Sequence, residues 1–241
     1  MDTGLNVALS SQIALEKRLS TIANNVANTN TVGFRAEKVR FEEVKTGLVD
    51  AATSFASKGT HYLSPVDGIA EQTGGELDFA IQGDAWFAVE TPAGIVVTRD
   101  GRFRMTAAGD LVTIDGHPVL DPGGAPIQLD PAAGSPVASK DGFLRQNGNQ
   151  IGALGLFEYQ PTANFRRQGN SGIIAETTPE PAVNRTDIGV IQGYVERSNV
   201  NPIDEMTRLI GLHRTFDNVA ALIRDSESSL EEAIRTLGPS S

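Results

Sequence analysis

Hydrophobic residues recur at helical spacing near both ends of the chain. From Leu5 to Val26, steps of three and four residues run through Leu5, Ala8, Gln12, Leu15, Leu19, Ile22 and Val26. Near the C-terminus the same steps run through Met206, Leu209, His213, Phe216, Ala220, Ile223, Glu227, Leu230, Ile234 and Leu237. Such steps are typical of helices that pair along one hydrophobic stripe. The pattern predicts one helix over residues 5–26 and a second over residues 202–237.

Helix-ending and helix-starting residues flank these two segments. Four asparagines stand at the end of the first helix: Asn24, Asn25, Asn28 and Asn30. Asparagine tolerates the left-handed backbone that ends helices, and Gly33 then adds a permissive backbone position. Asn201 is a suitable N-cap for the second helix, and Pro202 suits its first helical position. We therefore expect a turn after the first helix and a sharp start of the second.

The middle of the chain shows the pattern of short strands. Asp-Gly or Asn-Gly pairs stand at 67–68, 100–101, 115–116, 141–142 and 147–148. Apolar or β-prone runs lie at residues 85–89, 95–98, 111–114 and 154–157. Such pairs supply the positive φ angles of tight hairpins, so the pattern indicates an antiparallel sheet. We predict a β-rich domain over residues 75–192.

These patterns together predict an α+β fold with a discontinuous helical domain. Residues 1–35 hold the first helix and its turn, and residues 193–241 hold the second helix. We expect the two helices to pair like a coiled coil. The central, mainly antiparallel β domain spans 75–192, and residues 36–74 form a transitional segment without a clear assignment.

Charge and composition exclude several classes of function. The formal net charge is −10, whereas proteins that bind nucleic acids or membrane surfaces carry basic patches. No apolar run approaches the ~18 residues of a membrane-spanning helix, and no cleavable signal peptide is visible. The chain contains no cysteine, which excludes disulfides, thiolate catalysis and cysteine-based zinc sites.

The sequence also argues against catalysis. It has no phosphate-binding loop and no HExxH motif, and its histidines, His61, His117 and His213, lack the spacing of metal ligands. Three aspartates that a hydrolase could use each precede glycine, where turn formation already explains them: Asp100, Asp115 and Asp141. We expect no enzyme activity, no metal and no cofactor.

The two predicted helices carry more hydrophobic surface than one pair of helices can cover. Ile210, Leu212, Val219 and Leu222 lie off the stripe of the second helix, and Leu9 and Ile13 lie off that of the first. Four or five such side chains represent several kcal/mol of unrealised burial at ~25 cal/mol per Å². This surplus favours assembly with further copies. The alternative is a helix buried within its own β domain.

Three motifs carry a resemblance to a known family. The stretch 23–35, ANNVANTNTVGFR, resembles the ANNxANxNTxGF[KR] signature of flagellar rod and hook proteins. A second match is GYVERSNVN at 193–201, extended by 204–206 and 214–216. A third is LDFAIQGDAWF at 77–87, extended by 98–103 and 109–112. The motifs stand in the order of the family, and the chain most resembles its proximal-rod members.

The resemblance implies a mechanical role. Such proteins are axial subunits whose terminal helices pair with one another and with neighbouring subunits to form the inner tube of the rod, with the β domain outside. The implied partners are further copies, other proximal and distal rod subunits, and the flagellar export apparatus, which exports such proteins without a cleaved signal. The implied location is the basal-body rod that crosses the periplasm and transmits motor torque, without nucleic acid or membrane insertion.

Two sets of residues are the candidate assembly site. The turn after the first helix is assigned to Asn24, Asn25, Asn28, Thr31, Gly33 and Phe34. The assembly helices and the start of the second helix are assigned to Leu5, Leu15, Leu19, Ile22, Val26, Ser198, Asn199, Asn201, Met206, Leu209, Ile210, Leu212, Phe216, Val219 and Ile223. A Gly33→Val variant is expected to hinder assembly while the β domain stays folded.

Three other functions stay open at this stage. Within the family, the chain could be a distal-rod subunit. A secreted glycan-binding or adhesive β module would need exposed aromatic residues, but the single tryptophan, Trp86, lies in an apolar run that predicts core packing. A hydrolase would use a pair of the central carboxylates.

Overall fold

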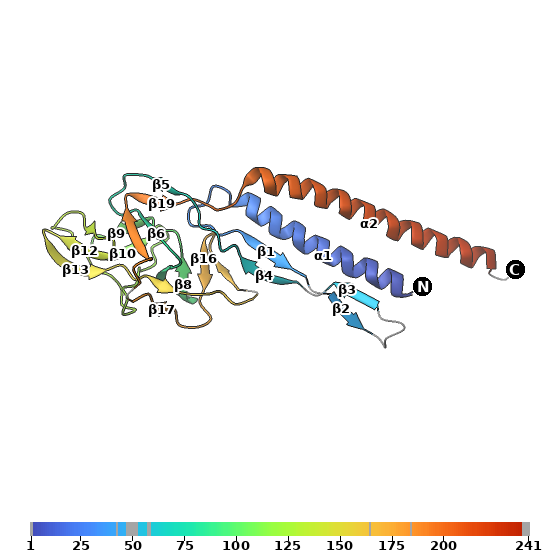
Figure 1. Cartoon of the computed structure of the whole chain (residues 1–241), viewed down its shortest axis with the longest axis horizontal. Coiled ribbons are helices and arrows are strands. Elements are labelled where there is room, and N and C mark those ends of the chain that lie inside the picture. Colours follow the sequence, from blue (N-terminus) through green and yellow to red (C-terminus); the bar gives the residue numbers. More distant parts are fainter. Residues whose placement is uncertain are drawn as a thin grey trace. The chain divides into compact units, whose positions relative to one another are not determined.

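The computed structural model has an α+β architecture with a helix at each end of the chain and strands between them (Figure 1). It describes residues 2–41, 43–46, 53–56, 59–163, 165–183 and 185–237. The chain forms two compact units. The helical unit comprises residues 1–27, 37–61 and 201–241, and the β unit comprises residues 28–36 and 62–200. Within the described residues, neither helix is apolar enough over a sufficient length to cross a membrane.

The helical unit is built on two long helices, α1 (Asp2–Ala27) and α2 (Pro202–Leu237). They contact each other and run side by side (Figure 1). Both predicted helices are therefore confirmed, with the first starting three residues earlier than expected. Three strands of four residues belong to this unit: β1 (Glu37–Arg40), β2 (Glu43–Thr46) and β3 (Thr53–Ala56). A fourth, β4 (Thr60–Leu63), begins in this unit and ends in the β unit. Strand β2 pairs antiparallel with β3, and β1 pairs with β4.

The β unit is made of short strands in several small sheets. Its largest sheet has the order β15-β16-β8-β7, in which β7 pairs antiparallel with β8 from Phe87↔Thr98 to Thr91↔Gly94. The strands are β5 (Ala70–Gln72), β6 (Phe79–Gln82), β7 (Phe87–Thr91), β8 (Gly94–Thr98), β9 (Phe103–Met105), β10 (Leu111–Thr113), β11 (Val137–Ala138), β12 (Phe143–Gln146), β13 (Asn149–Ala153), β14 (Phe157–Glu158), β15 (Arg167–Gln168), β16 (Gly172–Ile174), β17 (Glu180–Pro181), β18 (Gly189–Gln192) and β19 (Tyr194–Glu196). The central antiparallel β region is thus confirmed.

Aromatic and branched side chains fill the core of the β unit. Phe87 packs edge-on against Phe103, with ring centroids 5.1 Å apart, and the ring centroid of Phe79 lies 6.0 Å from that of Phe103. Leu111 and Leu144 complete the centre of this cluster. Such T-shaped aromatic pairs add about 0.5–1.5 kcal/mol to the burial of their area.

The predicted turns are partly right. Asn147 and Gly148 join β12 to β13 with φ angles of 49° and 81°, the backbone of a two-residue type I′ hairpin. Gly116 and Gly142 also have positive φ. The hairpins predicted at 67–68 and 100–101 are wrong. A Cβ at Gly101 would lie 1.8 Å from the carbonyl oxygen of Phe79, so that glycine serves a close backbone approach instead.

The predicted strand at 154–157 is also largely wrong, because only Phe157 lies in a strand. The preceding residues bond singly to different segments: the Leu154 amide donates to the carbonyl of Gly142, and the Gly155 amide donates to that of Leu120. Leu154 is nevertheless buried in the main core. The apolar run at residues 154–157 therefore indicates a buried segment, but not a strand with continuous backbone pairing.

Candidate functional site

Three segments far apart in the sequence bring buried charges together in the β unit. Arg35, Arg99 and Glu196 are each 3% exposed or less. The Glu196 carboxylate accepts a hydrogen bond from Arg99 Nη1 at 3.0 Å, and its other oxygen lies 3.4 Å from Arg35 Nε. One carboxylate thus bridges two arginines, and we call this group the Arg35–Arg99–Glu196 cluster.

Trp86 and Asp67 complete the surroundings of the cluster. The guanidinium groups of Arg35 and Arg99 lie 5.6 and 5.3 Å from the centroid of the Trp86 ring, within the range of cation–π attraction. The Asp67 carboxylate pairs with Arg35 Nη2 and lies 3.7 Å from Arg99 Nη2. Burial lowers the pKa of Arg99, and the neighbouring Glu196 opposes this shift. Trp86 is buried, as expected, but beside charges as well as hydrophobic side chains.

Gly33 and Phe34 fix the backbone of the same region. Gly33 has a φ of +69°, and its amide donates to the carbonyl of Glu196 at 2.7 Å. A Cβ on Gly33 would lie 2.2 Å from the backbone nitrogen of Asp100. Phe34 is 1% exposed and packs with Ala36 and Val200. These contacts join the predicted turn to the segment that precedes α2.

The asparagines of the turn make local hydrogen bonds. In the helical unit, the buried Asn25 amide binds both backbone groups of Glu37: its Oδ1 accepts from the amide, and its Nδ2 donates to the carbonyl, each at 2.9 Å. In the β unit, Asn28 accepts a hydrogen bond from the Thr31 hydroxyl at 3.0 Å and one from its amide at 3.1 Å. Asn24 is exposed on α1.

The segment before α2 has the predicted start signal. Asn201 Oδ1 accepts hydrogen bonds from the amides of Ile203, at 3.1 Å, and Asp204, at 3.4 Å, which is the geometry of an N-cap. Ser198 Oγ accepts from the Val200 amide at 3.3 Å. Asn199 Oδ1 accepts from the Ala36 amide at 2.7 Å, so this asparagine ties the two terminal motifs together within the β unit.

No hydrophobic side chain of α1 or α2 is fully buried among those the structure describes. The half-buried ones among the predicted assembly residues are Leu15, Leu19, Ile22, Val26, Leu209, Leu212, Phe216, Val219 and Ile223. Leu9, Ile13, Met206, Ile210 and Leu222 are 49–67% exposed. Leu212 and Val219, which lie off the predicted stripe, are half-buried, and Met206 is exposed despite its place on the stripe. The side chain of Leu5 lies outside the described residues.

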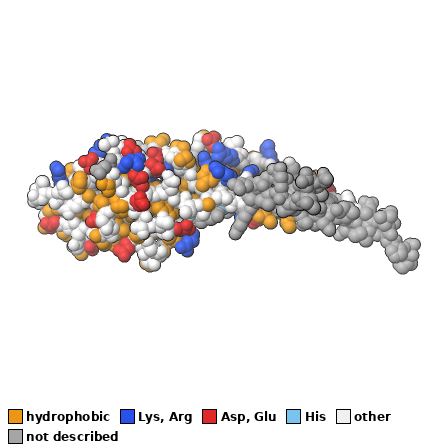
Figure 2. Space-filling model, turned by 60° about the horizontal axis from the view of Figure 1, so that its bottom comes forward, with side chains coloured by type: hydrophobic (Ala, Val, Ile, Leu, Met, Phe, Trp, Pro, Cys, Tyr) orange, Lys and Arg blue, Asp and Glu red, His pale blue; other side chains and the backbone are white. Residues whose placement is uncertain are grey.

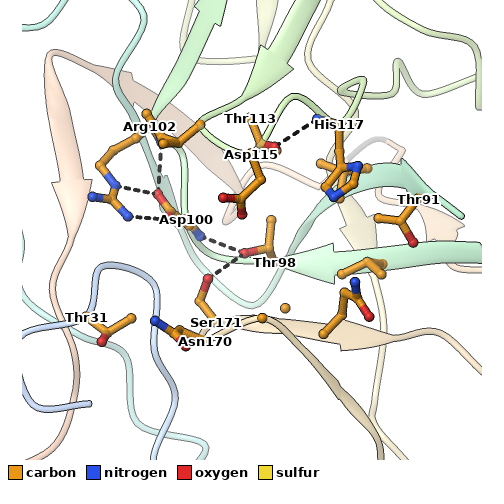
Figure 3. Close-up of a pocket in the computed structure, with 16 residues that line it drawn as sticks. Thr31, Thr91, Thr98, Asp100, Arg102, Thr113, Asp115, His117, Asn170 and Ser171 are labelled. Carbon is orange, nitrogen blue, oxygen red and sulfur yellow. Dashed lines mark hydrogen bonds and ion pairs between the residues drawn. The ribbon is translucent and has the colours of Figure 1, made fainter. Parts of the chain in front are cut away.

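A polar pocket of about 330 Å³ opens on the β unit (Figure 3). The Asp100 carboxylate accepts two hydrogen bonds from the Arg102 guanidinium, at 2.9 and 2.6 Å, and these bonds raise the pKa of Arg102. The Ser171 hydroxyl lies 3.3 Å from that of Thr98. In the described part of the chain, no three His, Asp or Glu side chains cluster as metal ligands would.

On the face in Figure 2, acidic and basic side chains are interspersed.

Comparison with known proteins covers both ends and the middle of the chain. Residues 5–35 match the model of the flagella basal body rod protein, and residues 191–236 match the C-terminal model of the flagellar basal body rod FlgEFG proteins. Residues 80–145 match the D1 domain of the flagellar hook proteins FlgE/F/G.

Full-length relatives decide the assignment. The chain is 58% identical to the flagellar basal-body rod protein FlgF of Mesorhizobium japonicum and 55% identical to FlgF of Rhizobium meliloti, with each comparison covering all of both chains. The chain belongs to the FlgF family of flagellar basal-body rod proteins. The FlgG protein of Bacillus subtilis is 30% identical over 91% of this chain and 93% of its own, so the distal-rod alternative has less support.

Each matched segment of this FlgF-family chain supplies one charge of the cluster. Arg35 ends the first segment, Arg99 lies in the second and Glu196 in the third. Sequence reasoning identified these motifs but gave their charged residues no role. The sequence feature that could have indicated the cluster is the presence of Arg or Glu within an otherwise uncharged or turn-forming motif.

Proposed function

We propose that this structural rod subunit belongs to the proximal rod and polymerises through α1 and α2 into a helical shaft that transmits motor torque. The observation that carries the proposal is the exposure of the two helices: no described hydrophobic side chain on either is fully buried in a single copy. At ~25 cal/mol per Å², covering these faces with neighbouring copies supplies a substantial driving force.

In this proposal the helices form an axial core domain, and a strand-rich outer domain lies outside it. Residues 1–35 and 193–241 supply the core, residues 36–74 connect it, and residues 75–192 form the outer domain. The helices pair in coiled-coil fashion within one copy and present Leu9, Ile13, Met206 and Ile210 to the next, because these side chains are about half exposed. The turn residues from Asn24 to Phe34 orient α1 for this contact.

The proposed partners are further copies and other proximal and distal rod subunits, and the location is the rod crossing the periplasm. The names of the FlgF and FlgG relatives support this setting. We further propose that the chain reaches the rod through the flagellar export apparatus without a cleaved signal peptide.

Deleting the chain tests its place in the rod. We expect basal bodies purified from cells that lack it to carry a rod truncated near its base, because later subunits lose the surface on which they assemble. Electron microscopy of those basal bodies measures the outcome, and restoring the wild-type chain is the control. A complete shaft without this chain would refute the proximal position.

Hydrogen exchange on the isolated chain tests the role of the helices. We expect amides of residues 206–223 to exchange rapidly in the monomer and to become protected on assembly, because their apolar faces lack cover in one copy. Amides of Val96 and Val97, in the buried centre of the largest sheet, serve as the protected reference. Strong protection across 206–223 in a verified monomer would overturn the proposed coupling.

A further inference from the structure

Helix α1 carries a second stripe of residues on its exposed side. Its members follow alternating steps of four and three residues, so they share one face of the helix, and each of them is exposed. Leu9 and Ile13, 52% and 49% exposed, begin it, and Glu16 is its single charged member. We call this set the α1 outer stripe: Leu9, Ile13, Glu16, Ser20, Ala23 and Ala27.

Helix α2 carries an exposed stripe of the same kind. Ile203, Ile210 and Leu222 are 74%, 56% and 67% exposed, and steps of three and four residues join them through polar members that are exposed as well. Arg214 is the single charged member. We call this set the α2 outer stripe: Ile203, Thr207, Ile210, Arg214, Asn218 and Leu222.

The single charges of the two stripes are opposite, and one copy leaves both of them unpaired. Among the residues that the structure describes, neither Glu16 nor Arg214 has an ion-pair or hydrogen-bond partner. Arg208 on the same helix, by contrast, donates to Glu205 at 2.8 Å. An α1 outer stripe laid on an α2 outer stripe therefore brings each charge its missing partner.

The spacing of the two stripes selects one register for that contact. The helices run antiparallel, with the end of α1 and the start of α2 at the same end of the pair (Figure 1). With an antiparallel α1 placed so that Glu16 lies opposite Arg214, the equal steps of the two stripes bring their other members together: Ser20 with Ile210, Ala23 with Thr207, Ala27 with Ile203, and Leu9 with Leu222. The register that pairs the charges also places apolar groups on apolar groups.

Small side chains on α1 face larger ones on α2 in this register. The alanines and the serine let the two helices approach closely, so Ile203 and Ile210 are removed from water. The Thr207 hydroxyl already donates to the Ile203 carbonyl at 2.8 Å, so covering it leaves no donor unpaired. Beside Ile210 stands Gly211, where a Cβ would meet nothing within 4 Å, so its lack of a side chain serves no packing need within one copy.

The other charges near the stripes stay at the edges of the contact. Lys17, Asp204 and Asp217 each adjoin a stripe residue in sequence, and therefore lie about 100° round the helix from it. Asp217 also lies 4.0 Å from His213 Nδ1 on its own helix. Asp225 follows Leu222 by three residues and falls opposite the part of α1 that precedes Leu9, at the end of the contact. Charges at such a rim remain hydrated.

We infer that the α1 outer stripe of one copy packs antiparallel on the α2 outer stripe of the next, with Glu16 and Arg214 paired across the contact. The inference rests on the proposed rod assembly and gives its helices a register and a recognising pair of charges. Because the two stripes are different surfaces, the contact is heterologous and repeats from copy to copy. Because Ala27 lies level with Ile203, as the helix ends do within one copy, neighbouring copies stand side by side.

Charge reversal tests the pair in cells that make the variant as their only copy of the chain. Glu16→Arg or Arg214→Glu alone places like charges across the contact, and each is expected to lower the amount of chain in purified basal bodies about tenfold or more. The two substitutions together restore the attraction and should recover most of the wild-type amount. Immunoblotting of basal bodies, normalised to the chain in whole cells, measures the outcome.

A second arginine of α2 provides the control for this rescue. Arg224 is exposed but lies outside the α2 outer stripe, so Glu16→Arg combined with Arg224→Glu is expected to stay as low as Glu16→Arg alone. Single reversals that leave the amount unchanged, or a double reversal of Glu16 and Arg214 that gives no recovery, overturn the pairing.

Single cysteines identify the neighbour, because the natural chain contains none. Two differently tagged chains, one with Ser20→Cys and one with Ile210→Cys, would be expressed together and their purified basal bodies oxidised mildly. Each chain holds one thiol, so any disulfide joins two molecules, and we expect disulfides that join the two tags. Ser228→Cys, an exposed position farther along α2, replaces Ile210→Cys in the control and is expected to give none.

The possible results separate the contact from the proposed function. Both tagged chains present in basal bodies, but not joined to each other, overturn the contact alone. A disulfide from Ser20→Cys to a protein other than this chain overturns the second copy as the occupant. Absence of the wild-type chain from basal bodies overturns the proposed function, and the contact with it.

Discussion

Replacing Glu196 by alanine is expected to destabilise the β unit by about 3–5 kcal/mol, because it leaves two buried arginines without their shared carboxylate. Arg35 and Arg99 are 3% and 0% exposed, and the Asp67 side chain, 53% exposed, reaches them only from the surface. Denaturant unfolding followed by fluorescence measures the effect, since the single tryptophan, Trp86, lies beside both guanidinium groups.

A surface ion pair in the same unit provides the control. Glu158 pairs with Arg185 at 2.8 Å, but both side chains are at least 40% exposed. Glu158→Ala is therefore expected to cost about 0–1 kcal/mol, as exposed pairs do. Equal losses from the Glu196 and Glu158 variants would show that the buried cluster has no special weight in the stability of the unit.

Replacing Gly33 by alanine is expected to destabilise the β unit by more than about 4 kcal/mol. Two effects add: a residue with a Cβ is strained at the φ of +69°, and that Cβ would lie 2.2 Å from Asp100 N and 2.5 Å from Arg99 C. Both neighbouring atoms belong to the backbone, so the clash cannot be relieved by turning a side chain. Trp86 fluorescence again follows unfolding, because Arg99 touches that ring.

Gly124→Ala is the control that separates backbone strain from the steric clash of the added Cβ. Gly124 has a φ of +82°, but a Cβ there would meet nothing within 4 Å. Its replacement should cost only the strain of the left-handed backbone, about 1–2 kcal/mol. If Gly33→Ala is no worse than Gly124→Ala, the close approach to Asp100 has no energetic consequence. The structure also changes the expectation for Gly33→Val, because Gly33 lies within the β unit and its loss should weaken that unit itself.

The helices could be predicted from sequence because their signals are local. Heptad steps and the Asn201-Pro202 start place α2 with its N-cap, and hydrogen bonds to the Ile203 and Asp204 amides bear this out. The strands of residues 36–74 could not be predicted, since segments of three or four residues contain too little periodicity. For example, the three residues of β5 are all exposed and carry no hydrophobic pattern.

The charged cluster was beyond sequence reasoning for a different reason. Arginine and glutamate are usually solvated, so nothing in the motifs predicted that Arg99 and Glu196 would be buried. Their burial depends on a contact between residues 97 positions apart. Likewise, Gly101 resembled a hairpin glycine, whereas its role is set by the approach of Phe79, a neighbour in space that local pattern does not reveal.

The distance in sequence between Arg99 and Glu196 has a consequence for how the chain matures. Glu196 is 97 residues from Arg99, and Gly33 binds its carbonyl from still farther away. If the polypeptide is delivered one end at a time, whether from a ribosome or through a narrow conduit, the bridging carboxylate and its arginines emerge at different moments. Until both Arg99 and Glu196 have been delivered, their ion pair cannot form and cannot stabilise a partly folded chain. The ion pair between Arg99 and Glu196 therefore forms only after both segments have been delivered.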